Sequence, residues 1–228
     1  MPAGTITALR AQANDSQRVN IFIDGAFALG VSLTTLSKAR LYVGKALTDE
    51  EFAQLEHAEQ GSKAYQAALR LLEARPRSTS EIRDRLRRKE FAPEAIDHAV
   101  ERLGELGLLD DRAFAKLWVE NRQTYRPRGP AALRNELRRK GVDRALVDQV
   151  LSNEALTGDP AAHAAELARS VVHKYAHADS RATFTRKLGG FLQRRGFDFE
   201  TIRPIIDQLW SELEQRAEDD EQSEYDEI

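Results

Sequence analysis

A basic segment occurs twice in this chain at a fixed offset and returns a third time in altered form. Leu86-Arg87-Arg88-Lys89 matches Leu137-Arg138-Arg139-Lys140 at an offset of 51 residues, and Leu192-Gln193-Arg194-Arg195-Gly196-Phe197-Asp198 follows 55 residues later. A helical period near 50 residues indicates tandem blocks, each too small to bury its apolar face well alone. We therefore expect a mainly α protein built as an elongated array of tandem three-helix repeats.

The first part of the chain has a different period. Apolar and other residues alternate on both sides of Asp24-Gly25, which is a strong signal for a two-residue hairpin turn. Residues 5–10 can add a third strand, giving a small N-terminal antiparallel β-hairpin or meander. Short helices are expected over 32–40 and from Thr48 onward. The predicted organisation is an N-terminal β-hairpin with short helices (1–63), three-helix repeats over 64–110, 111–156 and 157–216, and an acidic disordered tail (217–228).

Capping residues define the helices of the repeats. Repeat 1 is expected to contain helices over 64–74, 79–89 and 93–106, and Ser78 with Glu81 fits a capping box at the start of the second. Gly141 and Gly196 follow the second helices of the other repeats, where a left-handed residue commonly ends a helix. Glu90 stands at the matching position of repeat 1, so it must adopt that conformation or use another cap.

The net charge of −3 is unevenly distributed along the chain. Residues 217–228 contain seven acidic and no basic residues, which leaves +4 on the rest. A separate acidic tail is typical of disordered, solubilising ends, although it could also fold back over basic helices. The low overall charge therefore does not exclude a polyanionic partner.

The basic second helices are the main candidate binding residues. One such helix would ordinarily be a solvated face with cations near its C-terminus, which the helix dipole favours. Recurrence at the same register instead favours contact with a partner through phosphate or carboxylate groups. The candidate partner-binding residues are Arg83, Arg87, Arg88, Lys89, Arg126, Arg128, Arg134, Arg138, Arg139, Lys140, Arg194 and Arg195.

A helix-turn-helix that reads DNA bases is a competing interpretation of the second and third helices. The third helix of repeat 1 carries four acidic residues (Glu94, Asp97, Glu101 and Glu105) against Arg102. A recognition helix surrounded by phosphates should not carry that charge. Sequence-specific base readout is therefore not expected.

Enzyme, cofactor and metal signatures are missing from the sequence. The chain has no cysteine, and the glycines of Gly25–Gly30 lack the Lys-Ser/Thr of a phosphate loop. His173 and His177 could share one helix face but have no evident third metal ligand. We expect no catalytic residue, no cofactor, no metal and no membrane partner, and a cytoplasmic location. Trp118 and Trp210 are expected in the core, whereas Tyr125 could stack on a partner.

Several motifs together resemble the RecX family, whose members regulate the bacterial recombinase RecA. They are Arg75-Pro76-Arg77-Ser78, Leu86-Arg87-Arg88-Lys89, Leu106-Gly107-Leu108-Leu109-Asp110-Asp111-Arg112, Arg126-Pro127-Arg128-Gly129-Pro130 and Leu137-Arg138-Arg139-Lys140-Gly141-Val142. The resemblance covers about residues 64–210, and the hairpin near Asp24-Gly25 resembles an N-terminal extension of many members. The acidic tail and Glu90 depart from the pattern.

This resemblance implies a negative modulator that lies in the groove of the RecA–DNA filament. Such a protein would inhibit RecA's ATPase, strand-exchange and co-protease activities, and with them the SOS response and homologous recombination. The implied partners are the RecA nucleoprotein filament and, as a further candidate, single- or double-stranded DNA; we expect a monomer. The alternative is a DNA-binding protein that competes with RecA for DNA.

Overall fold

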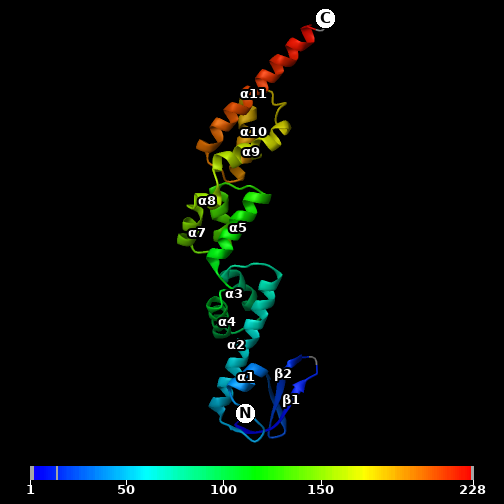
Figure 1. Cartoon of the computed structure of the whole chain (residues 1–228), viewed down its shortest axis with the longest axis vertical. Helices are drawn as coiled ribbons and strands as arrows, with labels where there is room; N and C mark the ends of the chain where they lie inside the picture. Colours follow the sequence, from blue (N-terminus) through cyan, green and yellow to red (C-terminus); the bar gives the residue numbers. More distant parts are fainter. Residues whose placement is uncertain (1–2, 14, 227–228) are drawn as a thin grey trace. The chain divides into compact units, whose positions relative to one another are not determined.

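The N-terminal segment forms a four-stranded antiparallel sheet. The computed structural model describes residues 3–13 and 15–226, with the side chains of 217 and 219–226 left aside. The strands are β1 (Gly4–Gln12), β2 (Asp15–Ile23), β3 (Ala26–Ser32) and β4 (Ala46–Leu47), in the order β3-β2-β1-β4. Figure 1 shows the sheet at the N-terminal end of the chain, with β1 and β2 labelled. The expected hairpin and third strand are confirmed. The two-residue strand β4, which pairs with the start of β1, was not foreseen.

The β2–β3 turn explains the register of the sheet. Asp24 and Gly25 both have positive φ angles, 48° and 85°, as a two-residue primed turn requires. With the turn fixed, Ile21 and Val31 lie on one face of the sheet and are buried. That face packs against α1 (Leu33–Lys38), which Ser32 caps, and against the first half of helix α2.

Helix α2 corrects the expected boundary near residue 63. It runs without interruption over Asp49–Ala74, so the two separate helices expected around that boundary are one element. Gly61 does not break the helix because it is buried, and a Cβ there would lie 3.0 Å from Nδ1 of His98 in α4. The first half of α2 therefore packs on the sheet, and the second half is the first helix of repeat 1.

Three tandem three-helix repeats follow. Repeat 1 is completed by α3 (Thr79–Arg87) and α4 (Pro93–Glu105); repeat 2 contains α5 (Asp111–Tyr125), α6 (Pro130–Arg139) and α7 (Arg144–Leu151); repeat 3 contains α9 (Pro160–Val171), α10 (Arg181–Arg194) and α11 (Phe199–Asp226). A short helix α8 (Glu154–Thr157) and a 3-10 turn (Val172–Lys174) were not anticipated.

The second helix ends in the same way in all three repeats. A residue just beyond the helix is left-handed each time: Glu90 at φ 62°, Gly141 at 76° and Gly196 at 93°. The next amide donates back to the carbonyl of a buried leucine, from Phe91 to Leu86, from Val142 to Leu137 and from Phe197 to Leu192. This is the Schellman pattern, and Glu90 adopts it despite its side chain.

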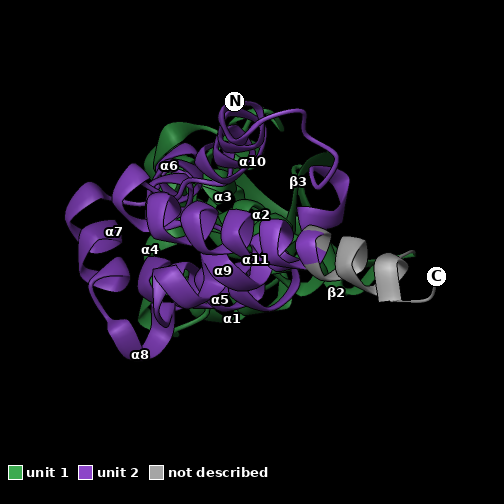
Figure 2. Ribbon diagram, turned by 90° about the horizontal axis from the view of Figure 1, so that it is seen from above, with its two compact units in different colours: residues 1–110 green, residues 111–228 purple. Residues whose placement is uncertain are grey.

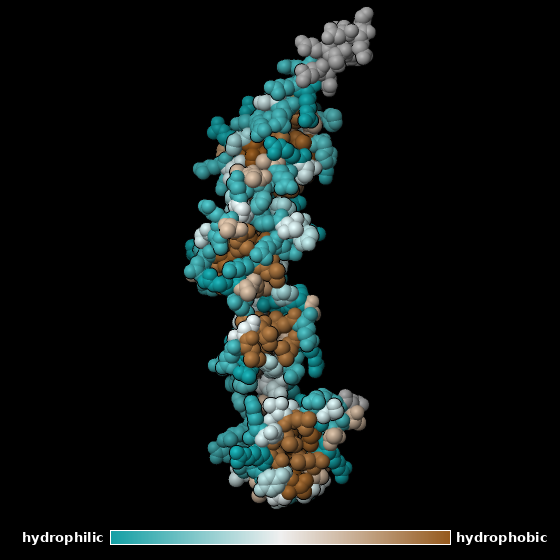
Figure 3. Space-filling view, viewed as in Figure 1, coloured by the Kyte–Doolittle hydropathy of each residue, from teal (hydrophilic) through white to brown (hydrophobic). Residues whose placement is uncertain are grey.

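The chain divides into two compact units, Met1–Asp110 and Asp111–Ile228 (Figure 2). Four separate apolar clusters form the cores, one beneath the sheet and one in each repeat. Hydrophobic residues on the face shown in Figure 3 likewise gather in separate patches. Thin layers of this kind follow from short helices, each of which buries one stripe.

Helix α11 extends into the segment that was expected to be a disordered tail. Its backbone is helical as far as Asp226, and residues 227–228 lie outside the described residues. From residue 211 to 226 the chain contains no glycine and no proline, and glutamate, glutamine, alanine and arginine are good helix formers. Helix α11 can therefore continue beyond its packed part.

Candidate partner-binding surface

The repeated basic residues lie at the C-terminal end of each second helix, in its last turn and in the one or two residues that follow it. Arg87-Arg88-Lys89, Arg138-Arg139-Lys140 and Gln193-Arg194-Arg195 precede the left-handed residue of each Schellman motif by the same spacing. Because the leucine just before each triplet is buried, the triplets lie beside the core. Cations there are favoured by the negative end of the helix dipole.

Four of the candidate residues form ion pairs inside their own repeats: Arg83, Arg87, Arg134 and, with Glu136, Arg128. Arg83 in α3 pairs with Asp97 in α4, and Arg134 in α6 pairs with Asp148 in α7 at 3.0 Å. Both members of the second pair stand 51 residues beyond those of the first. Arg83 and Arg134 therefore brace the second helix of a repeat against the third. Arg87 also has an internal partner, Asp84, at 2.8 Å.

Seven other candidates form no ion pair with any residue that the structure describes. Arg126 is exposed and Arg195 half-buried; the other five, Arg88, Lys89, Arg138, Arg139 and Arg194, are all exposed. Arg139 Nε donates a long hydrogen bond (3.3 Å) to the Asn135 carbonyl, and Arg138 and Arg139 line an open surface groove with Asn135. These side chains retain donors for an external anion.

Repeats 2 and 3 meet where the start of α6 contacts the end of α10. The Gly129 amide donates to the Arg195 carbonyl at 2.9 Å, and the Ala131 amide donates to the Gly196 carbonyl at 3.3 Å. A Cβ on Gly129 would lie 2.3 Å from the Gly196 carbonyl oxygen, so the approach requires glycine. The positive end of one helix thus satisfies the negative end of another.

This contact gathers arginines from distant parts of the sequence, namely Arg126, Arg128 and Arg195, called here the junction cluster. Burial lowers the pKa of Arg195, and the nearby charges of Arg128 and Arg126 lower it further. Nε of Arg128 is buried and has no hydrogen-bond partner among the described residues. The cluster is therefore a concentration of positive charge with an unused buried donor, suited to an anionic group.

Glu136 is the carboxylate that partly balances this charge. It accepts hydrogen bonds from Trp118 Nε1 (2.9 Å) and Arg122 Nε (2.7 Å), and Arg128 Nε lies 3.6 Å from its other oxygen. Burial raises the pKa of Glu136, but the hydrogen bonds and the two arginine charges outweigh burial and hold that pKa below its ordinary value. Lys140 Nζ lies over the ring of Trp118, 4.9 Å from the ring centre.

The aromatic residues and histidines that the sequence analysis named lie outside the basic helix ends. Trp118 and Trp210 are partly buried against the cores of repeats 2 and 3, as expected, and Tyr125 is 75% exposed. His173 lies in the 3-10 turn and His177 beyond it, so they do not share a helix face as proposed. Within the described residues no group of three metal-ligating side chains occurs, and no helix is long and apolar enough to cross a membrane.

Sequence reasoning missed the junction cluster. It named Arg126, Arg128 and Arg195 separately but gave no reason for them to meet. The sequence does contain one signal for this contact, a difference between repeats 1 and 2 at the start of the second helix. Ser78 and Glu81, the capping box of repeat 1, are replaced 51 residues later by Gly129 and Ala132, which leave room for another backbone.

Comparison with known proteins gives matches along most of the chain. Residues 4–48 match the model described as the regulatory protein RecX N-terminal domain, and residues 64–103, 110–151 and 159–206 match the first, second and third three-helix domains of RecX. A regulatory protein RecX of Bacillus licheniformis is 33% identical over 93% of this chain and 80% of its own length. The chain belongs to the RecX family.

Further relatives agree with this assignment to the RecX family. A regulatory protein RecX of Chlorobium phaeobacteroides is 39% identical over 65% of this chain and 94% of its own length. A crystal structure of regulatory protein RecX superposes with a TM-score of 0.74 at 27% identity, covering 89% of this chain and 98% of that one. The RecX of Lactobacillus salivarius gives a TM-score of 0.59 at 27% identity, with coverage of 67% and 97%. The family is one of regulatory proteins.

Proposed function

We propose that this chain is a negative modulator of the RecA recombinase that binds in the groove of the RecA–DNA filament. There it lowers RecA's ATP hydrolysis, strand exchange and co-protease activity, in the bacterial cytoplasm and as a monomer. The proposal extends the regulatory character of the RecX family to a specific partner. It assigns partner contact to the basic helix ends and not to any catalytic group.

One observation carries the proposal: exposed cations without internal partners recur at the end of the second helix in successive repeats. Arg88 in repeat 1, Arg139 in repeat 2 and Arg194 in repeat 3 occupy corresponding positions, and Lys89 and Arg138 are the immediate neighbours of two of them. A filament presents the same acidic or phosphate surface once in every subunit. Several weak contacts repeated along one chain gain avidity on such a partner when its spacing allows them to engage together.

The internal ion pairs narrow the proposed contact set. Arg83 and Arg134 are assigned to bracing within their repeats, because each has a carboxylate partner of its own. Arg88, Lys89, Arg138, Arg139, Arg194 and the junction cluster remain as the partner-binding residues; Arg128 of that cluster is kept because its Nε, although 3.6 Å from Glu136, makes no hydrogen bond with a described residue. Arg87, which is 62% exposed although paired with Asp84, is kept as an auxiliary contact because exposed pairs of this kind are weak.

The experiment is a titration of RecA's single-strand-DNA-dependent ATP hydrolysis with this protein, from far below to above equimolar. Binding of the protein to naked single-stranded DNA is measured in the same buffer. We expect inhibition well below equimolar, at concentrations where free DNA is barely bound. Inhibition that begins only as the DNA becomes saturated would instead identify a competitor for DNA and would refute action on the filament.

A further inference from the structure

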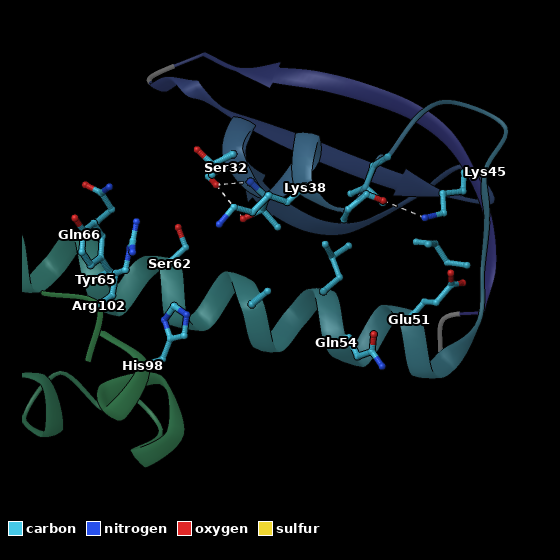
Figure 4. Close-up of a pocket in the computed structure, with 17 residues that line it drawn as sticks. Ser32, Lys38, Lys45, Glu51, Gln54, Ser62, Tyr65, Gln66, His98 and Arg102 are labelled. Carbon is cyan, nitrogen blue, oxygen red and sulfur yellow. Dashed lines mark hydrogen bonds between the residues drawn. The ribbon is translucent and has the colours of Figure 1, made fainter. Parts of the chain in front are cut away.

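A long groove lies within unit 1, between the end of β3 with helix α1 and the middle of helix α2. It consists of two adjoining pockets of about 860 and 820 Å³ that share Ser32, Thr34, Ser62 and Gln66. Figure 4 shows the first pocket: Ser32 and Lys38 face Ser62 and Gln66 of α2 across open space. No candidate residue except Lys89 belongs to this groove.

The second pocket is lined by four cations from three elements. Arg18 comes from β2, Lys63 and Arg70 come from α2, and Lys89 is at the end of α3. Arg18 is already engaged, because its Nη2 lies 2.6 Å from Oε1 of the fully buried Glu59. Lys63, Arg70 and Lys89 form no ion pair with any described residue.

The arrangement on α2 is regular. Lys63, Gln66, Ala67 and Arg70 recur at intervals of three and four residues, which places them on one face of the helix. Lys63 and Arg70 are seven residues apart, a rise of about 10 Å along the helix. The groove wall therefore presents two cations in line, and Lys89 adds a third from another helix.

Uncharged donors fill the spaces between the cations. They are the hydroxyls of Ser32, Thr34 and Ser62 and the amides of Gln17 and Gln66. The carboxylate at this end, Asp15, accepts a hydrogen bond from the Gln17 backbone at 3.0 Å. Lysine, arginine, serine, threonine and glutamine are the side chains that contact the sugar–phosphate backbone of nucleic acids. Two half-buried rings, Phe91 and Tyr65, line the two pockets and can contact bases.

We propose that this groove binds a single strand of DNA, with Lys63, Arg70 and Lys89 on its phosphates. A basic groove that follows the backbone and offers rings to the bases is the usual design for single strands. Both rings already pack against the core of repeat 1, so the choice of a nucleic acid over an acidic protein segment rests on the cations in line along α2 and on the hydroxyl and amide donors between them. This inference does not rest on the proposed action on RecA, because binding to naked DNA is its direct consequence.

The test is fluorescence anisotropy of a labelled oligothymidylate with K63E/R70E, without RecA. Its matched control is R169E/K174E, which makes the same charge change at exposed, unpaired cations of unit 2. We expect K63E/R70E to bind about ten-fold or more weakly and to reduce the log–log salt slope by about 1.4, since each single-strand phosphate contact contributes about 0.7. The control should bind like the parent chain.

Four results would overturn the proposal. Equal loss in both double variants would mean that only net charge matters, and unchanged affinity in K63E/R70E would mean that the groove does not hold DNA. Loss of RecA-filament binding with intact DNA affinity would make the groove a protein-binding surface. A parallel titration with duplex DNA should show the smaller effect, and the reverse would contradict single-strand binding. K63Q/R70Q, with circular dichroism and thermal midpoints for every variant, separates loss of contacts from loss of folding.

Discussion

The second helices of repeats 1 and 2 begin differently although they end alike. In repeat 1, Ser78 and Glu81 form a capping box, so α3 satisfies its own first amides. In repeat 2 the equivalent positions are Gly129 and Ala132, the side-chain cap is lost, and the amides of α6 reach the carbonyls that end α10. Loss of a local cap thus allows a contact between repeats.

The same two repeats also differ in the surroundings of the arginine that precedes the second helix in both. Arg77 and Arg128 are equivalent, but the residue facing Arg128 is Glu136, whereas Arg85 stands at the matching position of repeat 1. Burial lowers the pKa of Arg77 and the charges of Arg75 and Arg85 lower it further, against the opposing charge of Glu81. Arg77 instead donates to the Leu71 carbonyl at 2.9 Å. The partner of Arg128 in repeat 2 is therefore a carboxylate, whereas the partner of Arg77 in repeat 1 is a backbone carbonyl.

The largest loss of stability should come from placing the capping residues of repeat 1 at the equivalent positions of repeat 2. In G129S/A132E the new side chains would overlap the Gly196 backbone, which lies 2.3 Å from a Cβ at position 129. We expect a loss of about 3 kcal/mol in the unfolding free energy of unit 2. Both tryptophans, Trp118 and Trp210, belong to unit 2, so tryptophan fluorescence during urea unfolding reports it selectively. An unchanged fluorescence midpoint would show that the two repeats do not depend on this contact.

Removal of Glu136 should cause the second-largest loss of unfolding free energy. Glu136→Ala leaves Trp118 Nε1 without its acceptor and Arg122 and Arg128 without their shared counter-charge, a cost of about 2 kcal/mol in unit 2. The same urea titration measures it, with Glu120→Ala as a control because Glu120 is exposed on α5 and forms no ion pair with a described residue. Equal effects of the two substitutions would remove the special role of Glu136.

Acidification should weaken the same network. The pKa of Glu136 is lower in the folded chain than its ordinary value, so its contribution to stability is present above the ordinary pKa and is lost as pH falls through the folded pKa. We expect the fluorescence midpoint to fall between about pH 5 and pH 3. It should fall less steeply in Glu136→Gln, and identical slopes in the two proteins would assign the pH dependence to other carboxylates.

Removal of the capping box in repeat 1 should have a smaller effect, in the other unit. S78A/E81A loses two reciprocal hydrogen bonds and the Arg75–Glu81 pair, a cost of about 1 to 2 kcal/mol. The far-UV circular dichroism transition should shift, whereas the tryptophan transition should not. A shift of the tryptophan signal by the same amount would mean that the two units unfold together.

The smallest effect is expected at the helix-bracing ion pairs. Arg83→Ala and Arg134→Ala each remove a partly exposed pair that contributes less than about 1 kcal/mol. Neither substitution should change inhibition of RecA much, because both arginines are assigned to structure. A large loss of inhibition in either variant would return that residue to the partner-binding set.

Local patterns predicted most of this fold. The three repeats, the hairpin turn and the left-handed positions of Gly141 and Gly196 follow from spacing and residue type, whereas for Glu90 the sequence left a left-handed conformation and another cap both open. The continuity of α2 was missed because a glycine such as Gly61 disfavours a helix. The sequence alone does not show that His98 packs against this glycine. The ion pairs of Arg83 and Arg134 join residues 14 positions apart, and the junction cluster joins residues 67 or more apart. Such contacts depend on tertiary packing, which helical periodicity does not report.

The central claim is that the exposed basic helix ends contact the RecA filament, and R138E/R139E tests it most directly. Its matched control is R186E/K187E, another adjacent and exposed pair that forms no ion pair with a described residue. Both are titrated into RecA's single-strand-DNA-dependent ATP hydrolysis. We predict that R138E/R139E needs about ten-fold more protein for half-inhibition, with unchanged thermal midpoints, while the control inhibits like the parent chain. Equal inhibition by R138E/R139E and the parent chain would contradict the assignment of these helix ends to the filament.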